Sequence, residues 1–308
     1  LEAAAKADPS QEAVIVQAAG RFLRKKKPDK AIAILRLGQA ANPESVAIHE
    51  WLGLAYQQAA QPDEAISAFE AALALPHTTS VCINGLAKLY TKDKRYDDAF
   101  RVLDTALTKA NLSPKFWIHL VDLYTITGLA SQTNRDKIKV SIMKCLNRAV
   151  ALEPEDPLTL HRLADYYKVW GESDKAIALF IELIELNPGL ISVREQLADL
   201  YLRADKTEKA TRQLEAILRE RPTNERALFV LGGIKRQLDK LDEAAAHFET
   251  VLKINPKFEL AYYELAGVRL FQNKPSITLS TLKKAGEQFK PKFITKFYAG
   301  LAHSSLHQ

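Results

Sequence analysis

Two histidine–carboxylate pairs are the strongest candidates in this chain for metal binding or acid–base catalysis. His119 lies three residues before Asp122, and His161 lies four residues before Asp165. On a helix these spacings place each pair on one face, where an imidazole and a carboxylate could bind a metal ion or move a proton. The same spacings also suit an ordinary surface hydrogen bond, and nothing in the sequence makes the two pairs converge. The pairs therefore predict neither a metal site nor a catalytic pair.

The remaining reactive groups do not assemble into a known kind of active site. Cys82 and Cys145 are the only two cysteines, too few for a disulfide framework and without the CxxC spacing of a metal site. The sequence also lacks GxSxG, HExxH, GxxxxGK[ST] and GxGxxG motifs. We therefore expect no enzyme activity, no cofactor and no small-molecule substrate.

One basic run could contact phosphate groups. Residues 21–30 (RFLRKKKPDK) hold six basic side chains in ten positions. Only Phe22 interleaves with them, whereas surfaces that bind single-stranded nucleic acid alternate cations with several aromatic rings. A helical repeat that binds nucleic acid is therefore a less favoured alternative than one that binds protein.

The composition points to a helical protein with a sizeable core. Of 308 residues, 47% are hydrophobic and 26% charged, the net charge is only +6, and there are just 12 Gly and 13 Pro. Such a chain is too apolar for disorder and too poor in turn residues for an all-β fold. No apolar run approaches a membrane span and no signal-peptide pattern opens the chain, so a soluble cytoplasmic or periplasmic protein is expected, with the compartment open. The chain starts at Leu1 and its only methionine is Met143, which suggests a processed or truncated product.

A regular repeat organises the chain. Alanines recur every 34 positions in two series, and prolines do so in a third: Ala31, Ala65, Ala99; Ala176, Ala210, Ala244; Pro154, Pro188, Pro222, Pro256. Ala99 and Ala176 are 77 positions apart, which equals two periods plus nine, so one repeat carries an insertion. Repeats are expected at 12–45, 46–79, 80–113, 114–156 (with the insertion), 157–190, 191–224, 225–258 and 259–292. Residues 1–11 are left as an N-terminal cap or linker, and 293–308 as a capping helix or a truncated ninth repeat.

Each repeat shows two amphipathic helical patterns, a first (A) and a second (B), and no strand-like alternation of useful length. Gly53 and Gly232 lie on A helices at the level of Ala65 and Ala244 on the following B helices. Small side chains at these positions let the two helices approach closely. The insertion predicts a surface loop at Gly128 and residues 131–134, followed by a lengthened B helix that Thr133 or Asn134 can cap, and deletion of 129–137 is expected to leave folding intact.

These residues carry a resemblance to the tetratricopeptide repeat family, whose pattern is W-x2-L-G-x2-Y, then A-x3-F, then P. Three repeats show it well: Leu52, Gly53, Tyr56, Ala65 and Phe69; Leu163, Ala164, Tyr167, Ala176, Phe180 and Pro188; Leu231, Gly232, Ala244, Phe248 and Pro256. The resemblance implies an all-α fold, a right-handed α-solenoid superhelix of about eight helix-turn-helix repeats plus a C-terminal half-repeat. It also implies a protein or peptide partner held in a concave groove lined by the A helices.

In this family the groove side chains come from positions 2, 5, 9, 12 and 13 of each A helix. Carried onto this chain, they include Asn84, Lys88, Lys92, His119, Asp122, His161, Asp165, Lys168, Glu195, Asp199, Arg203, Phe229, Arg236, Tyr263 and Phe271. These positions predict a basic patch, an acid-rich centre and an aromatic and basic C-terminal end. Residues 155–220 hold 9 basic and 13 acidic side chains, whereas 221–308 hold 14 and 8. We therefore expect a partner with basic residues at the acidic centre and apolar residues at Phe229, Tyr263 and Phe271.

One known binding mode of the family is disfavoured. A clamp of Lys, Asn and Arg side chains grips a C-terminal carboxylate in some members, but the matching positions here are Val16, Gly20, Trp51, Val81 and Gly85. The main expectation is thus a protein-interaction scaffold without chemistry of its own. The alternative is a regulatory or substrate-presenting repeat domain of a larger multidomain enzyme.

Overall fold

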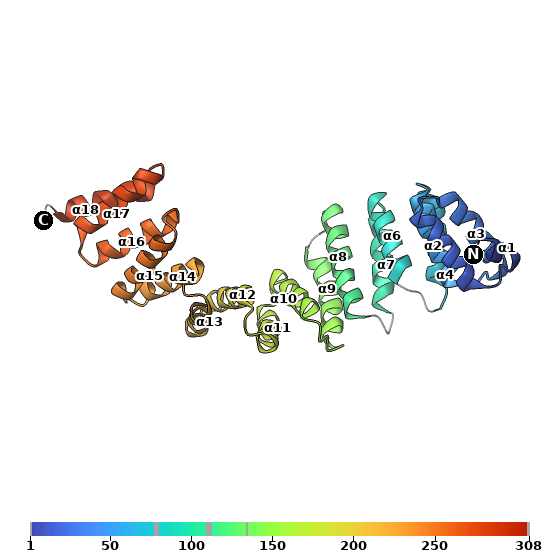
Figure 1. Cartoon of the computed structure of the whole chain (residues 1–308), viewed down its shortest axis with the longest axis horizontal. Helices are drawn as coiled ribbons and strands as arrows, with labels where there is room; N and C mark the ends of the chain where they lie inside the picture. Colours follow the sequence, from blue (N-terminus) through green and yellow to red (C-terminus); the bar gives the residue numbers. More distant parts are fainter. Residues whose placement is uncertain (1, 77–79, 109–112, 134, 307–308) are drawn as a thin grey trace. The chain divides into compact units, whose positions relative to one another are not determined.

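The fold is described by a computed structural model that covers residues 2–76, 80–108, 113–133 and 135–306. All regular structure in these residues is α-helical (Figure 1), which confirms the predicted all-α class. The chain divides into two compact units, Leu1–Tyr166 and Tyr167–Gln308. The repeat boundaries themselves stay a prediction, and the one at 79 falls outside the described residues.

Unit 1 contains ten helices in its described part, the last of which carries the boundary with unit 2. They are α1 (Glu2–Ala7), α2 (Glu12–Arg24), α3 (Pro28–Ala41), α4 (Val46–Gln58), α5 (Pro62–Ala74), α6 (Ser80–Lys92), α7 (Tyr96–Leu107), α8 (Pro114–Ala130), α9 (Arg135–Val150) and α10 (Pro157–Val169). Unit 2 continues with α11 (Ser173–Leu186), α12 (Ile191–Arg203), α13 (Thr207–Glu220), α14 (Glu225–Gln237), α15 (Leu241–Ile254), α16 (Glu259–Phe271), α17 (Pro275–Gln288) and α18 (Phe293–Leu306).

The even-numbered helices from α2 onward are the A helices, and the odd-numbered helices from α3 onward are the B helices. Within each unit an A helix packs on the B helix that follows it and on the next A helix, as α4 does on α5 and α6. Figure 1 shows this arrangement for α6 to α9 in unit 1. A row of A helices therefore forms one face of each unit, and we call it the A-helix face.

A left-handed residue ends each A helix and sets the turn into its B helix. Lys26, Ala60 and Lys94 in unit 1 have positive φ angles of 54°, 58° and 61°, and they are spaced by the same period as the alanines. The amide after each one donates back into the helix, as Gln61 N does to Tyr56 O at 2.9 Å. Because this cap recurs with the period of the sequence, the helix pairs recur at the same interval.

The nine-residue insertion lengthens both helices of its repeat, the A helix α8 as well as the B helix α9 that was expected to be longer, and leaves only a short turn between them. The residue with a positive φ angle in this repeat is Gln132. The interval from Lys94, the corresponding residue of the preceding repeat, and the interval to Gly171, that of the following repeat, both exceed the regular period. The first interval is longer by four positions and the second by five, and α8 reaches 17 residues. Gly128 lies inside α8, where an added Cβ would meet Ile138 Cδ1 at 2.6 Å. The expected turn after residue 130 and the lengthened B helix are confirmed, at residues 131–133 and in the 16-residue α9, whereas the expectation that Gly128 belongs to the loop was wrong because α8 continues to Ala130; residue 134 lies outside the described part.

The rings of buried phenylalanines explain the small residues of the A helices. Phe69 on α5 is fully buried, and a Cβ added to Gly53 on α4 or to Gly85 on α6 would lie 2.4 or 2.5 Å from its ring. Gly232 on α14 meets Phe248 on α15 in the same way, at 2.7 Å. Gly53 and Gly232 therefore make room for the rings of Phe69 and Phe248. Each phenylalanine lies four residues after the alanine that the sequence had suggested as the contact of that glycine.

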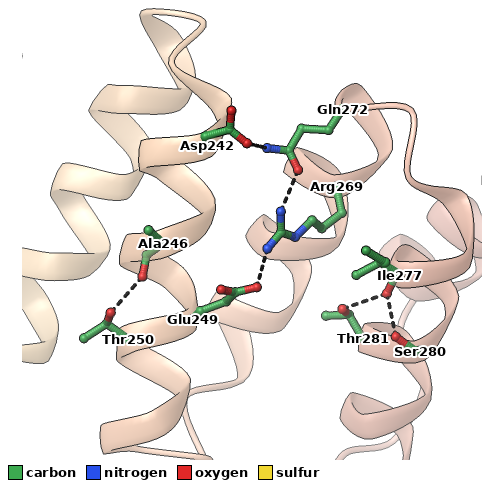
Figure 2. Close-up of polar contacts among 9 residues, drawn as sticks. All are labelled: Asp242, Ala246, Glu249, Thr250, Arg269, Gln272, Ile277, Ser280 and Thr281. Atoms are coloured by element: carbon green, nitrogen blue, oxygen red, sulfur yellow. Dashed lines mark hydrogen bonds and ion pairs between the residues drawn. The ribbon is translucent and has the colours of Figure 1, made fainter.

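A polar contact between residues 20 positions apart joins each B helix to the next A helix in the repeats named here. Tyr56 accepts from Arg36 Nε at 2.9 Å, Tyr124 donates to Asp104 at 2.7 Å, and Tyr90 donates to Glu70. On α16 of unit 2 Arg269 takes the tyrosine position and bonds to Glu249, and Gln272 donates to Asp242 beside it (Figure 2). These bonds satisfy polar groups at the inter-repeat contact, where an unpaired group would be costly.

We expect the Tyr90–Glu70 contact to make the fold sensitive to alkaline pH. Burial and the bond to Glu70 raise the pKa of Tyr90 from 10.0 to about 12. The unfolded chain releases this proton first, so the stabilisation is complete below about pH 10 and is lost as the pH rises through about 12. Tyr90→Phe should therefore make the fall in unfolding free energy between about pH 9 and pH 11 shallower, measured by urea titration.

Tyr96→Phe is the control, because Tyr96 is only partly buried at the start of α7. If both variants kept the wild-type slope, the Tyr90 contact would have no part in alkaline sensitivity.

Candidate functional site

In unit 1 the predicted site residues lie on α6, α8 and α10, and they share the A-helix face. Lys88 and Lys92 are exposed on α6. Five others are half-buried, because each contacts a side chain of its own or a neighbouring A helix: Asn84, His119, Asp122, His161 and Asp165.

A continuous polar row crosses this face of unit 1. His119 Nε2 on α8 lies 2.8 Å from Asn84 Oδ1 on α6, and its Nδ1 lies 3.7 Å from Asp122 Oδ2. Asp122 in turn accepts from Arg162 Nη2 of α10 at 2.9 Å and from the Tyr166 hydroxyl. Sequence reasoning found the first three members but not Arg162 and Tyr166, which lie about 40 positions further along the chain.

The two histidine–carboxylate pairs stay apart as two local contacts. Burial lowers the pKa of His119, an effect that the nearby Asp122 carboxylate opposes. His161 Nδ1 lies 3.1 Å from Asp165 Oδ2 on the same helix. In the part of the chain that the structure describes, no three His, Cys, Asp or Glu side chains gather as they would around a metal ion. Each pair therefore acts as a contact within the A-helix face.

In unit 2 cations of the chain itself already contact the carboxylates of the predicted acidic centre. Arg226 on α14 lies 3.7 Å from Glu195 and 2.5 Å from Asp199, both on α12. Asn224 Nδ2 also donates to Glu195, at 3.2 Å, and Lys168 donates to Gln196. In unit 1 Arg162 pairs with Asp122, and His161 Nδ1 contacts Asp165. A basic partner would have to displace these contacts, which weakens the expectation of an acidic centre.

The three predicted aromatic residues differ in their access to a partner. Phe271 is 68% exposed at the end of α16. Tyr263 is buried, and its hydroxyl donates to Glu259 at 2.7 Å. Phe229 is partly buried, with its ring centroid 5.5 Å from that of Phe248. The expected apolar contact with Tyr263 thus needs correction, because its ring is part of the core.

The A-helix face of each unit carries a pocket. In unit 2 a pocket of about 330 Å³ is lined by Phe229 and Arg236 of α14, and Arg236 Nε lies 3.1 Å from Glu264 on α16. The exposed Arg203 stands at the end of α12, which also contributes to this pocket through Leu202. Two of the predicted residues, Phe229 and Arg236, are thereby brought together.

In unit 1 a larger pocket, of about 540 Å³, lies between α2 and α4, and we call it the Trp51 pocket. Its lining is Ala13, Val14, Val16, Gln17, Gly20, Arg24 and Trp51. Sequence reasoning considered Val16, Gly20 and Trp51 only for the absence of a carboxylate clamp, and so it missed the pocket. The signal available was a glycine at position 9 of one A helix with a tryptophan at position 6 of the next.

The cysteines and the hydropathy of the helices add no further site. Cys82 and Cys145 are both buried, and burial raises the pKa of the Cys145 thiol to about 12, which makes it an unreactive core group. Among the described helices, none combines the length and the apolar character needed to cross a bilayer.

Comparison with known proteins agrees with this geometry. Two family models, both described as tetratricopeptide repeat, match residues 16–77 with 195–267 and residues 159–190, together more than half of the chain. The C-terminal part of a TPR repeat-containing protein from Cytophaga hutchinsonii has a similar fold: the TM-score is 0.52 at 15% identity, over 81% of this chain and 99% of that one.

Two curated relatives carry the same repeat in their names. Tetratricopeptide repeat protein 21A of Mus musculus is 23% identical over 69% of this chain, and that of Homo sapiens is 26% identical over 57%. The matched regions span only 18% and 14% of those proteins. The family models, with the helix pairs and caps described above, establish the identity that the sequence period suggested: this chain belongs to the tetratricopeptide repeat family.

Proposed function

We propose that the chain is a protein-interaction scaffold that holds a segment of a partner protein against its A-helix face. The observation that carries the proposal is the pocket on this face in each unit, set among half-exposed polar side chains. Each pocket is only large enough for a side chain or two, while polar side chains elsewhere on the A helices, such as Asn84 and Asp122, offer hydrogen bonds to an extended backbone. Such a surface suits recognition of a peptide better than catalysis, which needs convergent groups in a closed site.

The stacked-repeat architecture of the family also supports a binding role. Stacked helix pairs present an extended open surface whose side chains come from successive repeats, so affinity accumulates over several weak contacts. Polar rim contacts of this kind position a partner, and buried apolar anchors supply most of the binding energy. The pockets are the places on the A-helix face where such anchors fit.

The proposal is tested by selecting peptides from a random-peptide phage library on the purified chain and mapping where they bind. A photo-crosslinking residue is placed at Lys88, exposed on A helix α6, or at Lys144, exposed on B helix α9. We expect the selected peptides to crosslink from position 88 and not from position 144. Failure to enrich any peptide, or crosslinks from position 144 alone, would sink the proposal.

A further inference from the structure

Several cations on the A-helix face of unit 1 form no ion pair, in contrast to the acid-rich centre predicted from sequence. Two cations further along the chain are compensated: Arg162 pairs with Asp122, and Arg226 with Glu195 and Asp199. Arg24 on α2 and Lys88 and Lys92 on α6, by comparison, make no ion pair with any residue that the structure describes. The N-terminal part of the face in unit 1 therefore carries an uncompensated positive charge.

The Trp51 pocket lies at this positive end. A Cβ added to Gly20 would lie 3.2 Å from Trp51 Cη2 and 3.6 Å from Arg24 Nη1, so the indole and the guanidinium stand over the same glycine. The rest of the lining is mostly aliphatic, from Ala13, Val14 and Val16. The pocket thus combines an aromatic wall, an aliphatic floor and a cation at its edge.

The cation at the edge is one of a cluster. Arg21, Lys25, Lys26 and Lys27 adjoin Arg24 in the chain, and none of them forms an ion pair within the described ranges. The C-terminus of α2 favours cations through its carbonyl groups, which explains part of this cluster. The effect of the helix terminus does not explain, however, why one of these cations, Arg24, lines an apolar pocket.

We propose that the Trp51 pocket takes a bulky apolar side chain of an acidic partner segment. The apolar side chain would pack on the Trp51 indole and the aliphatic floor, while acidic residues beside it would meet Arg24 and the neighbouring cations. An aromatic anchor would in addition contact the Arg24 guanidinium through its ring face. This inference rests on the proposed function and adds to it the chemistry of the partner, opposite in charge to the partner expected from sequence.

Three synthetic peptides of equal length test the proposal by fluorescence anisotropy on the full chain: Glu-Asp-Glu-Phe-Asp-Glu-Asp, the same peptide with Ala in place of Phe, and the same with Lys in place of every acid. We expect the acidic peptide with Phe to bind most tightly. Loss of the Phe, Trp51→Ala and Arg24→Glu should each weaken its binding about tenfold or more, and added salt should weaken it further. Equal or tighter binding of the lysine peptide, or unchanged affinity of Trp51→Ala, overturns the proposal.

Controls separate a local effect from unfolding and from loss of the whole binding face. Trp51→Phe keeps an aromatic wall and should retain most of the affinity. Arg219→Glu reverses an exposed charge on B helix α13 and should bind as the wild type does. If phage-selected peptides bind the A-helix face but are not acidic and ignore Arg24→Glu, this inference fails while the proposed function stands. If no selected peptide binds the A-helix face, the proposed function itself fails, and this inference fails with it.

Discussion

Phe69→Ala is expected to lower the free energy of unfolding by about 3–5 kcal/mol, the usual cost of removing a buried phenylalanine side chain. The ring is fully buried and lies between two A helices, with Gly53 on one side and Gly85 on the other. Neither glycine has a side chain that could move into the space that the ring leaves. The cavity therefore stays open, and two neighbouring repeats lose their shared contact.

Urea unfolding followed by far-ultraviolet circular dichroism measures the change. Phe271→Ala is the matched control, because Phe271 is 68% exposed and its truncation opens no cavity; about 0.5 kcal/mol or less is expected there. Equal losses from the two truncations would show that the buried ring does not hold the repeats together.

Gly232→Val is expected to destabilise the chain by about 3 kcal/mol, the upper range for overpacking a close contact. A Cβ at this position would lie 2.7 Å from Phe248 Cε1 and 2.9 Å from Cζ. The ring cannot easily retreat, because it is fully buried and is also packed against Phe229. Either the ring leaves its rotamer or α14 and α15 separate, and both responses cost packing energy.

The control is the next residue of the same helix. Gly233→Val adds the same side chain where nothing lies within 4 Å of the new Cβ. Since glycine and valine differ little in helix propensity, this variant should stay within about 0.5 kcal/mol of the wild type. The prediction is contradicted if thermal and urea unfolding place both variants at the same stability.

The comparison of Gly232 with Gly233 shows what the repeat pattern could and could not predict. The sequence marked Gly232 as a small residue at a helix contact, because the period places it opposite a B helix. It suggested Ala244 as the partner, whereas the structure places the Phe248 ring there. Periodicity identifies the face of a helix, but the direction in which a long side chain crosses to its neighbour depends on rotamers.

The insertion gave a similar result. Counting the period located nine extra residues in one repeat, and the polar residues at 131–134 predicted a loop that leads into a lengthened B helix, without marking a longer A helix. In the structure four of the added residues come before the left-handed Gln132 and lengthen α8, and the other five come after it. Extending a helix satisfies the backbone hydrogen bonds of the added residues, which a longer loop would leave to water.

The charge of the candidate site is where sequence reasoning was least reliable. Counting acidic and basic residues predicted an acid-rich centre, and the counts are correct. Asp199 and Arg226, however, are 27 positions apart and form an ion pair between α12 and α14. A count along the chain cannot show such pairing. Lys88 and Lys92, which the sequence marked as a basic patch, are exposed and form no ion pair with any residue that the structure describes, whereas the place of Arg24 at the Trp51 pocket became visible only in three dimensions.

The family, the helical class and the face of each A helix follow from the residue pattern alone, because they depend on a period that is local in the chain. Tertiary structure decided the rest: which ring fills the space at each glycine, which charges pair, and where a pocket remains. Gly20 and Trp51 lie on different helices and form one pocket only because α2 and α4 are neighbours in the stack. Contacts of this kind depend on how repeats pack and which rotamers they select, and neither is encoded in the spacing of residues along the chain.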